Sequence, residues 1–476
     1  MLKRALPACG AVLMALGLGM SSSLPALAQQ TVPPTPTPVA VDTFNPSAAN
    51  GRTVVKWYVG LGTGAQPAQI DTEKKVVDQF NASQSQIYVN LQIVDNRVAS
   101  STLATQIAAG NPPDIVGPVG TVGRATFDGN WLDLTPLIQA NNVDLSVYEP
   151  SVVQNYNLPG QGQVGLPFAI YPSFIYFNKD LFDEAGLPYP PQRYGDTYMG
   201  KEWNFDTLRE IGMKLTVDDR GNDANSPEFA PDRIVQFGFH TQFGTEPRAV
   251  GTLFGAAKPI DANGNAVIPP NWLQAWNWFY TGEFTDHFIP NQAYRNSDLF
   301  GKDNVFNSGN LAMAYTHLWY TCCIDPVSKN GKVHNWDIAV VPSYNGVTTA
   351  KLHADSFGIM KASQHPNEAF KVYQYLISNP ELFKVYGAMP AIKSMQADFF
   401  GSLDQQFAPN KVNWSVALAS LQYIDLPNHE EGLPNYLKAR QALTDFETLI
   451  TTTPGLDINI EAAKLQGTLN AIYHES

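Results

Sequence analysis

The chain has 476 residues, with 30 Lys and Arg against 43 Asp and Glu, and so carries a formal net charge of −13. This acidity disfavours nucleic acids and anionic membrane surfaces as partners. Charged residues make up 15% of the chain, below the usual share of about 25%. Gly, Pro and aromatic residues are plentiful. The composition indicates a folded, loop-rich protein that is long enough for two domains.

Residues 1–28 have the features of a secretory signal peptide. Two basic residues precede the apolar run AVLMALGLGM, and Ala26–Ala28 is a small-residue pattern of the kind that signal peptidase cuts. The apolar run is shorter than the roughly 20 residues of a membrane span. Cys9 precedes this run, whereas a lipid-modified cysteine would follow it. We therefore expect an exported protein, in the periplasm or at the outer face of the cell membrane.

The next segments predict a tether followed by an α/β fold. Residues 29–50 are rich in Pro, Thr and Ala and carry one charge, as in a semi-extended linker. Residues 53–59 (TVVKWYV) and 87–94 (IYVNLQIV) have the pattern of strands, and residues 71–83 between them have helical spacing. A further helix is predicted over 365–378, HPNEAFKVYQYLIS. Strand, helix and strand in this order indicate an α/β domain.

Five motifs in a fixed order carry a family resemblance. They are IAAGNPPDIV from Ile107, GNWLDLTPLI from Gly129, GLPFAIYPSFIYFNKDLFDEAGLPYPP from Gly165, FNSGNLAMAY from Phe306 and LPNHEEGLPNY from Leu426. In this order and spacing, residues 51–440 resemble the extracellular solute-binding proteins of ABC importers, in the carbohydrate-binding family that includes maltose-binding proteins.

The resemblance implies an α/β fold of the two-lobe periplasmic-binding-protein type (type II), with a hinge between the lobes and the ligand in the cleft. It places residues 51–168 and 342–389 in lobe 1, and residues 169–341 and 390–476 in lobe 2. Ligand contacts to both lobes would favour a closed form. The permease of an ABC transporter would recognise that form. The resemblance implies a monomer without a cofactor that captures a mono- or oligosaccharide and is not an enzyme.

Position within the motifs singles out Trp319 and Tyr171 as ligand contacts. In the maltose-binding relatives a sugar-stacking tryptophan lies six residues after the Met of the Gly-x-x-Ala-Met run, and here that position is Trp319. A tryptophan offers a broad apolar face to a pyranose; the alternative is a core aromatic. The relatives have a carboxylate seven residues before the Asn of the Tyr-Asn-Lys-Asp run, where this chain has Tyr171. The pocket therefore departs from the maltose type.

Other candidates for the cleft lie at strand ends, near the predicted crossings between lobes, and beside Trp319. Their side chains supply the donors and acceptors that sugar hydroxyls need, although each one could equally be a solvated loop residue or a helix cap. These candidates are Tyr58, Gly60, Arg124, Glu246, Arg248, Tyr320, His353, Asp355, Asn428 and Glu430.

Cys322 and Cys323 are the two cysteines that remain once the predicted signal peptide is removed. In an oxidising compartment the favoured hypothesis is a vicinal disulfide beside Trp319. Such a ring is strained, because neighbouring Cα atoms lie about 3.8 Å apart and most disulfides join Cα atoms roughly 4.4–6.8 Å apart. The alternative is a pair of buried thiols that act as small hydrophobes.

Catalytic and metal motifs are weak. No His-Glu-x-x-His or Cys-x-x-Cys occurs, so no metal site is predicted. The loop Asp218–Asn225 is rich in oxygen ligands but fails the EF-hand pattern, and a solvated turn is favoured. Two alternatives to sugar capture stay open. One is an exported glycoside-active enzyme with paired carboxylates, and the other is the same fold with a polyamine, peptide or metal chelate as its ligand.

Overall fold

The computed structural model describes residues 41–242, 244–300, 304–324 and 333–475. The predicted signal peptide and residues 29–40 of the predicted linker lie outside the described residues. In the described part of the chain, none of the helices combines the length and the apolar character that crossing a bilayer requires.

Within the described residues, eleven strands form one mixed sheet, which confirms the α/β class. The strand order is β1-β3-β2-β4-β14-β7-β12-β11-β10, and β13 and β15 also pair with β7. The strands are β1 (Val41–Asp42), β2 (Thr53–Val59), β3 (Ile87–Ile93), β4 (Ile115–Val119), β7 (Ala169–Asn178), β10 (Val217–Asp218), β11 (Ile234–Thr241), β12 (Leu311–His317), β13 (Trp336–Ala339), β14 (Leu352–Ile359) and β15 (Met389–Pro390).

Helices pack along this sheet, together with two small hairpins, β5 (Asn157–Leu158) with β6 (Gly162–Gln163) and β8 (Thr197–Tyr198) with β9 (Lys201–Glu202). The helices are α1 (Pro46–Ala49), α2 (Pro67–Ser83), α3 (Asn96–Ala108), α4 (Thr121–Thr126), α5 (Thr135–Ala140), α6 (Pro150–Gln154), α7 (Lys179–Glu184), α8 (Phe205–Lys214), α9 (Pro247–Gly251), α10 (Pro270–Phe284), α11 (Gln292–Arg295), α12 (Pro366–Ile377), α13 (Pro380–Tyr386), α14 (Gln396–Phe407), α15 (Ser415–Ser420), α16 (Tyr436–Thr452) and α17 (Ile458–Tyr473). The 3₁₀ turn η5 (Leu318–Cys322) follows β12 directly.

The predicted elements agree closely with the structure. The strand over 53–59 is β2 with the same bounds, and the strand over 87–94 is β3. The helix predicted over 71–83 begins earlier, at Pro67, because proline suits the first turn of a helix, where its missing N–H is not needed. The helix over 365–378 is α12, and its predicted apolar face is buried.

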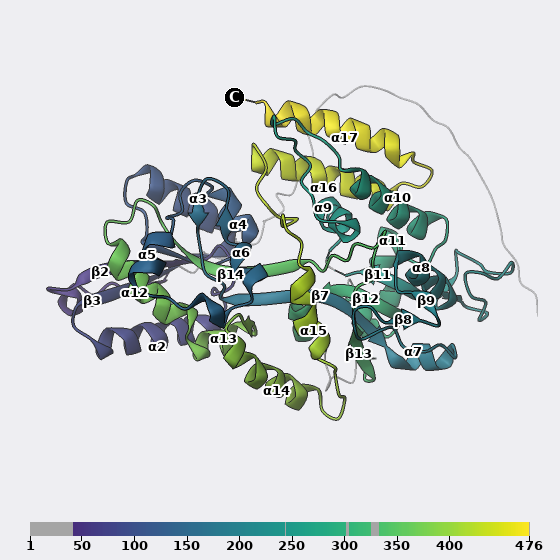
Figure 1. Cartoon of the computed structure of the whole chain (residues 1–476), viewed down its shortest axis with the longest axis horizontal. Coiled ribbons are helices and arrows are strands. Elements are labelled where there is room, and N and C mark those ends of the chain that lie inside the picture. The colour runs from purple at the N-terminus through teal and green to yellow at the C-terminus, as the bar shows by residue number, and fades with distance from the viewer. Residues whose placement is uncertain (1–40, 243, 301–303, 325–332, 476) are drawn as a thin grey trace, which may run out of the picture. The chain divides into compact units, whose positions relative to one another are not determined.

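Two large apolar cores lie along the sheet, and β7 and β14 connect them (Figure 1). The first core is built from β2, β3, α2, α12 and α13, with Trp57 and Phe370 fully buried. The second core is built from β7, β11, β12, α8, α10, α16 and α17, with Trp272 and Trp276 at its centre. The strand β7 pairs with β14 through Ala169–Pro172 and with β12 through Ser173–Phe177. One strand therefore serves both halves of the sheet.

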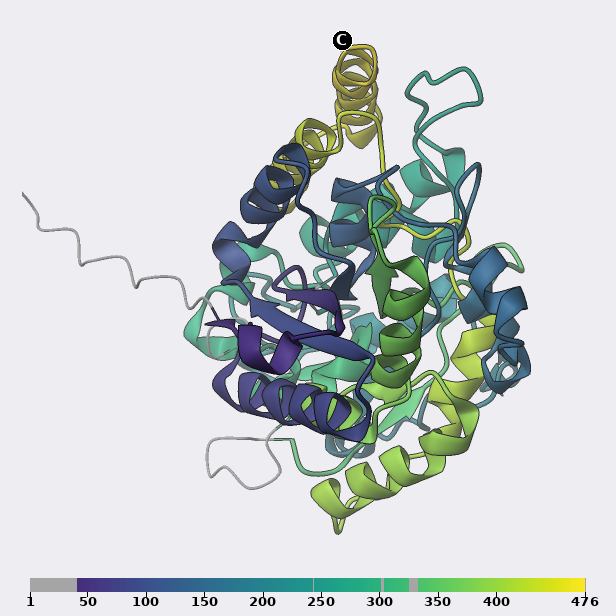
Figure 2. The same cartoon turned by 90° about the vertical axis from the view of Figure 1, so that its left-hand side faces the viewer.

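The structure corrects the end of the predicted linker. Residues 41–50 are folded, because Val41 pairs with Ile93 in an antiparallel bridge and Pro46–Ala49 form α1. The side chain of Asn45 caps α1 by accepting the backbone N–H groups of Ser47 and Ala48. Figure 2 shows this purple segment beside the sheet. A two-residue strand and a capped turn thus add an edge to the sheet in place of a tether.

Candidate functional site

A loop from Asp425 to Glu431 packs against the start of β14. Asp425 Oδ1 accepts the backbone N–H of Leu352 at 2.8 Å, and Asn428 Nδ2 donates to the Leu352 carbonyl at 2.9 Å. The loop thereby takes the place of a sheet neighbour for the first residues of β14. This arrangement brings His353, the next residue along β14, beside His429 and Glu430.

His353, His429 and Glu430 form a partly buried polar cluster. His353 Nδ1 lies 3.2 Å from Glu430 Oε2, and His429 Nδ1 lies 2.5 Å from Asp425 Oδ2. Burial alone would raise the pKa of Glu430, but His353, His429 and Arg248 together more than offset this, and the pKa falls to about 2. Burial lowers the pKa of His353, and the Glu430 carboxylate reverses that effect and raises the pKa above its ordinary value.

A row of rings continues from this cluster to Trp319. The rings of His429 and His353 have centroids 5.1 Å apart, and His353 and His317 are 4.2 Å apart. His317 and Trp319 are parallel within 11°, with centroids 5.9 Å apart. Trp319 packs against both the first and the second core. Tyr171 is the register partner of His353 across β7 and β14. The predicted stacking residue thus lies at the boundary between the two cores.

Arg124 and Asp355 are two further charged residues whose charges act on this cluster. The Arg124 guanidinium is 4.7 Å from the centroid of the Tyr156 ring, and its Nη1 has no hydrogen-bond partner among the described residues. Burial raises the pKa of Asp355 to about 6, although the charges of His353 and Arg124 oppose the rise. A buried guanidinium with an unused donor is costly without a partner. Arg124 is therefore suited to donate to a ligand oxygen.

Glu246 and Arg248 support the loop and cap a helix. Glu246 Oε2 accepts the backbone N–H of Ala249 at the start of α9, and its Oε1 lies 2.9 Å from Arg248 Nε. Arg248 Nη1 donates to the Glu431 carbonyl at 3.1 Å, and the Arg248 side chain is buried. The two residues lie close to the cluster, and their present contacts hold the 425–431 loop in place.

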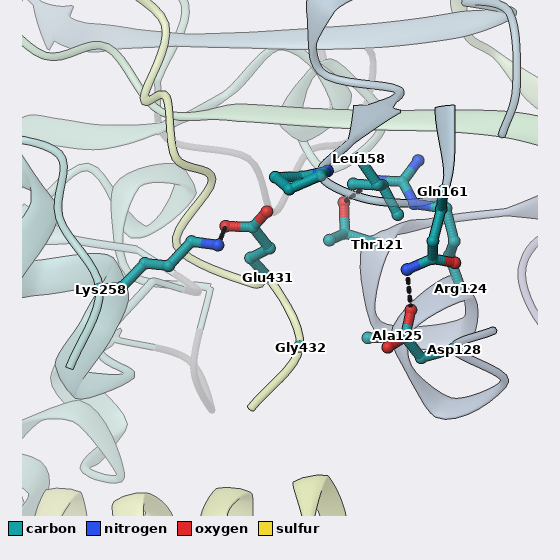
Figure 3. Close-up of a pocket in the computed structure, with 10 residues that line it drawn as sticks. Thr121, Arg124, Ala125, Asp128, Leu158, Gln161, Lys258, Glu431 and Gly432 are labelled. Carbon is teal, nitrogen blue, oxygen red and sulfur yellow. Dashed lines mark hydrogen bonds and ion pairs between the residues drawn. The ribbon is translucent and has the colours of Figure 1, made fainter. Parts of the chain in front are cut away.

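A cavity of 180 Å³ opens beside Arg124. Its lining combines residues that precede β7 with residues that follow it. In Figure 3, Lys258 reaches Glu431 on one side, and Gln161 donates to Asp128 on the other at 2.6 Å. The residues that line it are Thr121, Arg124, Ala125, Asp128, Leu158, Pro159, Gln161, Lys258, Glu431 and Gly432. Trp319 does not line this cavity, which meets the cluster at Glu431, the residue after Glu430.

Three predicted contacts lie elsewhere. Tyr58 is fully buried and donates to the Ala99 carbonyl at 2.7 Å, because its side chain points toward α3. Gly60 also abuts α3, and a Cβ there would lie 2.4 Å from the Val94 carbonyl oxygen. Tyr320 is buried in the second core, where its hydroxyl donates to Asn304 Oδ1. These three residues support the fold around them.

The two cysteines are not bonded to each other in the structure, and the vicinal disulfide stays a prediction. Cys322 and Cys323 are free thiols with Sγ atoms 2.8 Å apart, longer than the ~2.05 Å of a disulfide bond. The residues end the 3₁₀ turn η5, and one thiol faces the other at hydrogen-bond distance in place of closing the strained ring. The sulfur of its neighbour lowers the pKa of Cys322 to about 7.

Sequence reasoning missed three polar residues of this region. Lys351 is buried, and burial lowers its pKa to about 8 against the opposing charge of Asp425. His317 is buried, and its Nε2 has no hydrogen-bond partner among the described residues. Asp425 accepts the backbone N–H of His429 as well as that of Leu352. Lys351 lies two residues before His353, and Asp425 directly precedes the motif LPNHEEGLPNY, so the signal for these two was a polar residue close to positions already singled out.

The loop Asp218–Asn225 has the contacts of a turn. The carboxylate of Asp218 accepts the backbone N–H groups of Arg220, Asn222 and Ala230 at 2.9–3.1 Å. Desolvation is the largest single effect and would raise the pKa of Asp218, but these bonds and the one from the Asn222 side chain together lower it to about 2. The lone pairs of that carboxylate are thus directed to the loop's own backbone.

Comparisons with known proteins agree with this architecture. The chain is 28% identical over 160 residues to the sn-glycerol-3-phosphate-binding periplasmic protein UgpB of Rhizobium meliloti (strain 1021), over 32% of this chain and 36% of the relative. It thus spans about a third of the length of that curated relative. The crystal structure of M. tuberculosis UspC matches with a TM-score of 0.68 at 20% identity, over 88% of this chain and all of that one.

The sugar-binding protein MalE from the phytopathogen Xanthomonas citri matches with a TM-score of 0.65 at 16% identity, over 88% of this chain and 97% of that one. The fold is therefore the two-lobe type II fold of periplasmic binding proteins, as the motifs implied. The family of bacterial extracellular solute-binding proteins matches residues 65–381. On that match, the chain belongs to the family of bacterial extracellular solute-binding proteins.

Proposed function

We propose that this protein is the exported substrate-binding component of an ABC importer and that it captures a mono- or oligosaccharide between its two lobes. Residues 51–168 and 342–389 form lobe 1 in this proposal, and residues 169–341 and 390–476 form lobe 2. Membership of the solute-binding family and the fold that the chain shares with the sugar-binding MalE support the proposal. The protein releases the sugar unchanged to the permease and works as a monomer in the periplasm or at the outer face of the membrane.

One observation carries the choice of a sugar. Trp319 lies at the boundary of the two cores, at one end of a row of rings that leads to His353 and Glu430. Pyranose rings present an apolar C–H face to an aromatic side chain and hydroxyl groups to polar ones. A ligand held in this way touches both lobes, so its binding free energy favours the closed form.

A polyol phosphate is the second candidate. The match to a glycerol-3-phosphate-binding relative and the unused donor of buried Arg124 favour it. The charges around Arg124 oppose it, because the carboxylates of Glu430 and Glu431 both act on this guanidinium. A dianionic phosphate would meet repulsion there, whereas neutral hydroxyls would not. The sugar is therefore the stronger candidate.

The test is ligand-dependent thermal unfolding of the mature chain after co-purified ligand has been removed by unfolding and refolding. The panel contains mono- and oligosaccharides, sn-glycerol 3-phosphate, polyamines and amino acids, and each hit is analysed for product. A ligand at 100 times its dissociation constant adds ~2.7 kcal/mol to the free energy of unfolding. A sugar that stabilises the protein and is recovered intact supports the proposal. Its conversion to product would establish the enzyme in its place.

A matched pair of variants tests the site. Trp319→Leu removes the stacking face and is expected to weaken sugar binding at least tenfold, which corresponds to about 1.4 kcal/mol. Trp278→Leu changes a tryptophan that packs on the second core, next to Phe205 and Phe288. This control is expected to lower the unfolding midpoint and leave the sugar affinity unchanged. Equal loss of affinity in both variants would contradict the assignment of Trp319.

A further inference from the structure

His353, His429 and Glu430 come from two segments that share no metal motif, yet each offers a ligand atom within 4.8 Å of those of the other two. His353 Nδ1 and Glu430 Oε2 lie 3.2 Å apart. Two ligands bound at about 2.05 Å to a tetrahedral Zn²⁺ ion lie roughly 3.3 Å apart. The observed separation therefore matches one edge of such a coordination shell.

Asp425 orients the buried member of the cluster. Its Oδ2 lies 2.5 Å from His429 Nδ1 and accepts the His429 backbone N–H at 2.8 Å, and its Oδ1 accepts the Leu352 N–H. These contacts fix the imidazole and leave Nε2 as the ring nitrogen available to a ligand. A carboxylate that holds the second nitrogen of a ligating histidine is the usual outer shell of a metal site.

The cluster can be reached from solvent, and it borders a buried group without a partner. The side chains of His353 and Glu430 are 31% and 19% exposed, whereas that of His429 is 2% exposed. An ion can thus enter past His353, and the buried side chain of His429 closes the inner side of the site. The ring of His317 lies 4.2 Å from that of His353, and its buried Nε2 has no hydrogen-bond partner among the described residues. The His317 Nε2 atom is therefore a further polar atom on the residue next to His353.

We propose that His353, His429 and Glu430 bind one divalent transition-metal ion of the Zn²⁺ class, with Asp425 as the residue that positions His429. Two imidazoles and one carboxylate favour such ions over Mg²⁺ and Ca²⁺, which prefer oxygen ligands throughout. Three protein ligands leave a coordination position for water or a ligand oxygen. The positive charges nearby are that of Lys351, which acts on His353, and those of Arg248 and Arg124, which interact with the Glu430 carboxylate. This site goes beyond the proposed function, because the ion binds whether or not a sugar is present.

The experiment uses the full mature chain without a polyhistidine tag, stripped with a chelator and then dialysed free of it. Zn²⁺ is titrated by calorimetry, and Co²⁺ is titrated by visible absorption, where a tetrahedral site gives intense d–d bands. One ion per chain is expected. His353→Ala and Glu430→Gln are each expected to weaken Zn²⁺ binding at least tenfold. The control is His365→Ala, an exposed histidine whose side chain makes no cap hydrogen bond.

The outcomes separate the site from its rivals. Retained stoichiometric binding in both His353→Ala and Glu430→Gln would overturn the proposal, as would equal weakening in His365→Ala. The absence of Zn²⁺ and Co²⁺ binding by the unmodified chain would also overturn it. Circular dichroism of each stripped variant confirms that the fold is intact, so a loss of binding reports on the ligands. The sugar panel repeated in excess chelator keeps the two proposals apart, because sugar binding without metal supports the receptor alone.

Discussion

Glu73 provides a test of how burial controls stability. This residue of α2 is fully buried, and its Oε1 accepts a hydrogen bond from the Tyr386 hydroxyl at 2.6 Å. Its Oε2 has no partner among the described residues. Burial raises the pKa of Glu73 to about 8, and the bond from Tyr386 offsets only part of that rise. At neutral pH the folded protein therefore holds Glu73 in its neutral form.

The sign of the pH dependence follows from the two states. In the unfolded chain this carboxyl group ionises near its ordinary pKa of 4.5, whereas in the folded protein it keeps its proton up to about pH 8. Between these values each pH unit favours the unfolded chain by ~1.4 kcal/mol. The contribution of Glu73 to the free energy of unfolding is thus fully present at acid pH and is lost as the pH rises. From pH 5 to pH 8 the loss amounts to about 3.5 kcal/mol, because ionisation is incomplete at both ends of this range.

The perturbation is Glu73→Gln, which is neutral at every pH and keeps an oxygen to accept the Tyr386 hydroxyl. Urea unfolding of the wild type and the variant at pH 5, 6, 7 and 8 gives the difference in unfolding free energy at each pH. That difference in unfolding free energy is expected to move in favour of the variant by about 3.5 kcal/mol between pH 5 and pH 8. Glu381→Gln, at a surface ion pair with Lys75, is the control. Parallel curves for wild type and Glu73→Gln would refute the reasoning.

Three further predictions concern single groups. Cys322 is expected to react with iodoacetamide well before Cys323 at pH 7.5, because Cys323 lowers the pKa of Cys322 to about 7. Peptide mapping measures the two rates, and equal rates would contradict this prediction. Asp286→Asn is expected to lower the unfolding free energy by about 2 kcal/mol in urea titrations, because Arg209 binds this buried carboxylate through two nitrogens at 2.6 and 2.7 Å. Gly238→Ala is expected to destabilise the folded protein by about 1–3 kcal/mol, since the new Cβ would lie 2.0 Å from a backbone oxygen of α8. By contrast, the new Cβ of Gly401→Ala in α14 meets no atom within 4 Å, and this variant is expected to stabilise the folded protein by about 0.5–1 kcal/mol. The same unfolding assay compares the two alanine variants.

The regular elements could be predicted because their sequence periods are strong. The alternation in 53–59 and the helical spacing in 365–378 reflect one buried face each, and the structure has those elements. The first residues of the fold were missed, because Val41 pairs with Ile93 across about fifty residues of chain. Such pairing depends on which strand edge is free, and a local pattern carries no information about that.

The candidate site was predicted in part. His353, Asp355 and Glu430 do meet, because strand ends and the loops beside them gather at one edge of an α/β sheet. Tyr58 lies at a strand end too, but its side chain faces α3. Which face a side chain takes at the last residue of a strand depends on how the neighbouring helix packs. The contribution of Asp425 was harder to foresee, because it contacts the backbone N–H groups of Leu352 and His429 as well as the His429 ring.

The position of β14 in the sheet has a consequence for how the chain acquires its fold. This strand lies between β4 and β7, and near its end Ser363 donates to Asp114 across 249 residues. The N-terminal half therefore cannot complete its sheet until a segment from the last third of the chain has arrived. Contacts over such separations form slowly, since a long loop must close first. A nascent chain that ends before Leu352 leaves the edge of β4 open, so assembly of both halves is a late and concerted event.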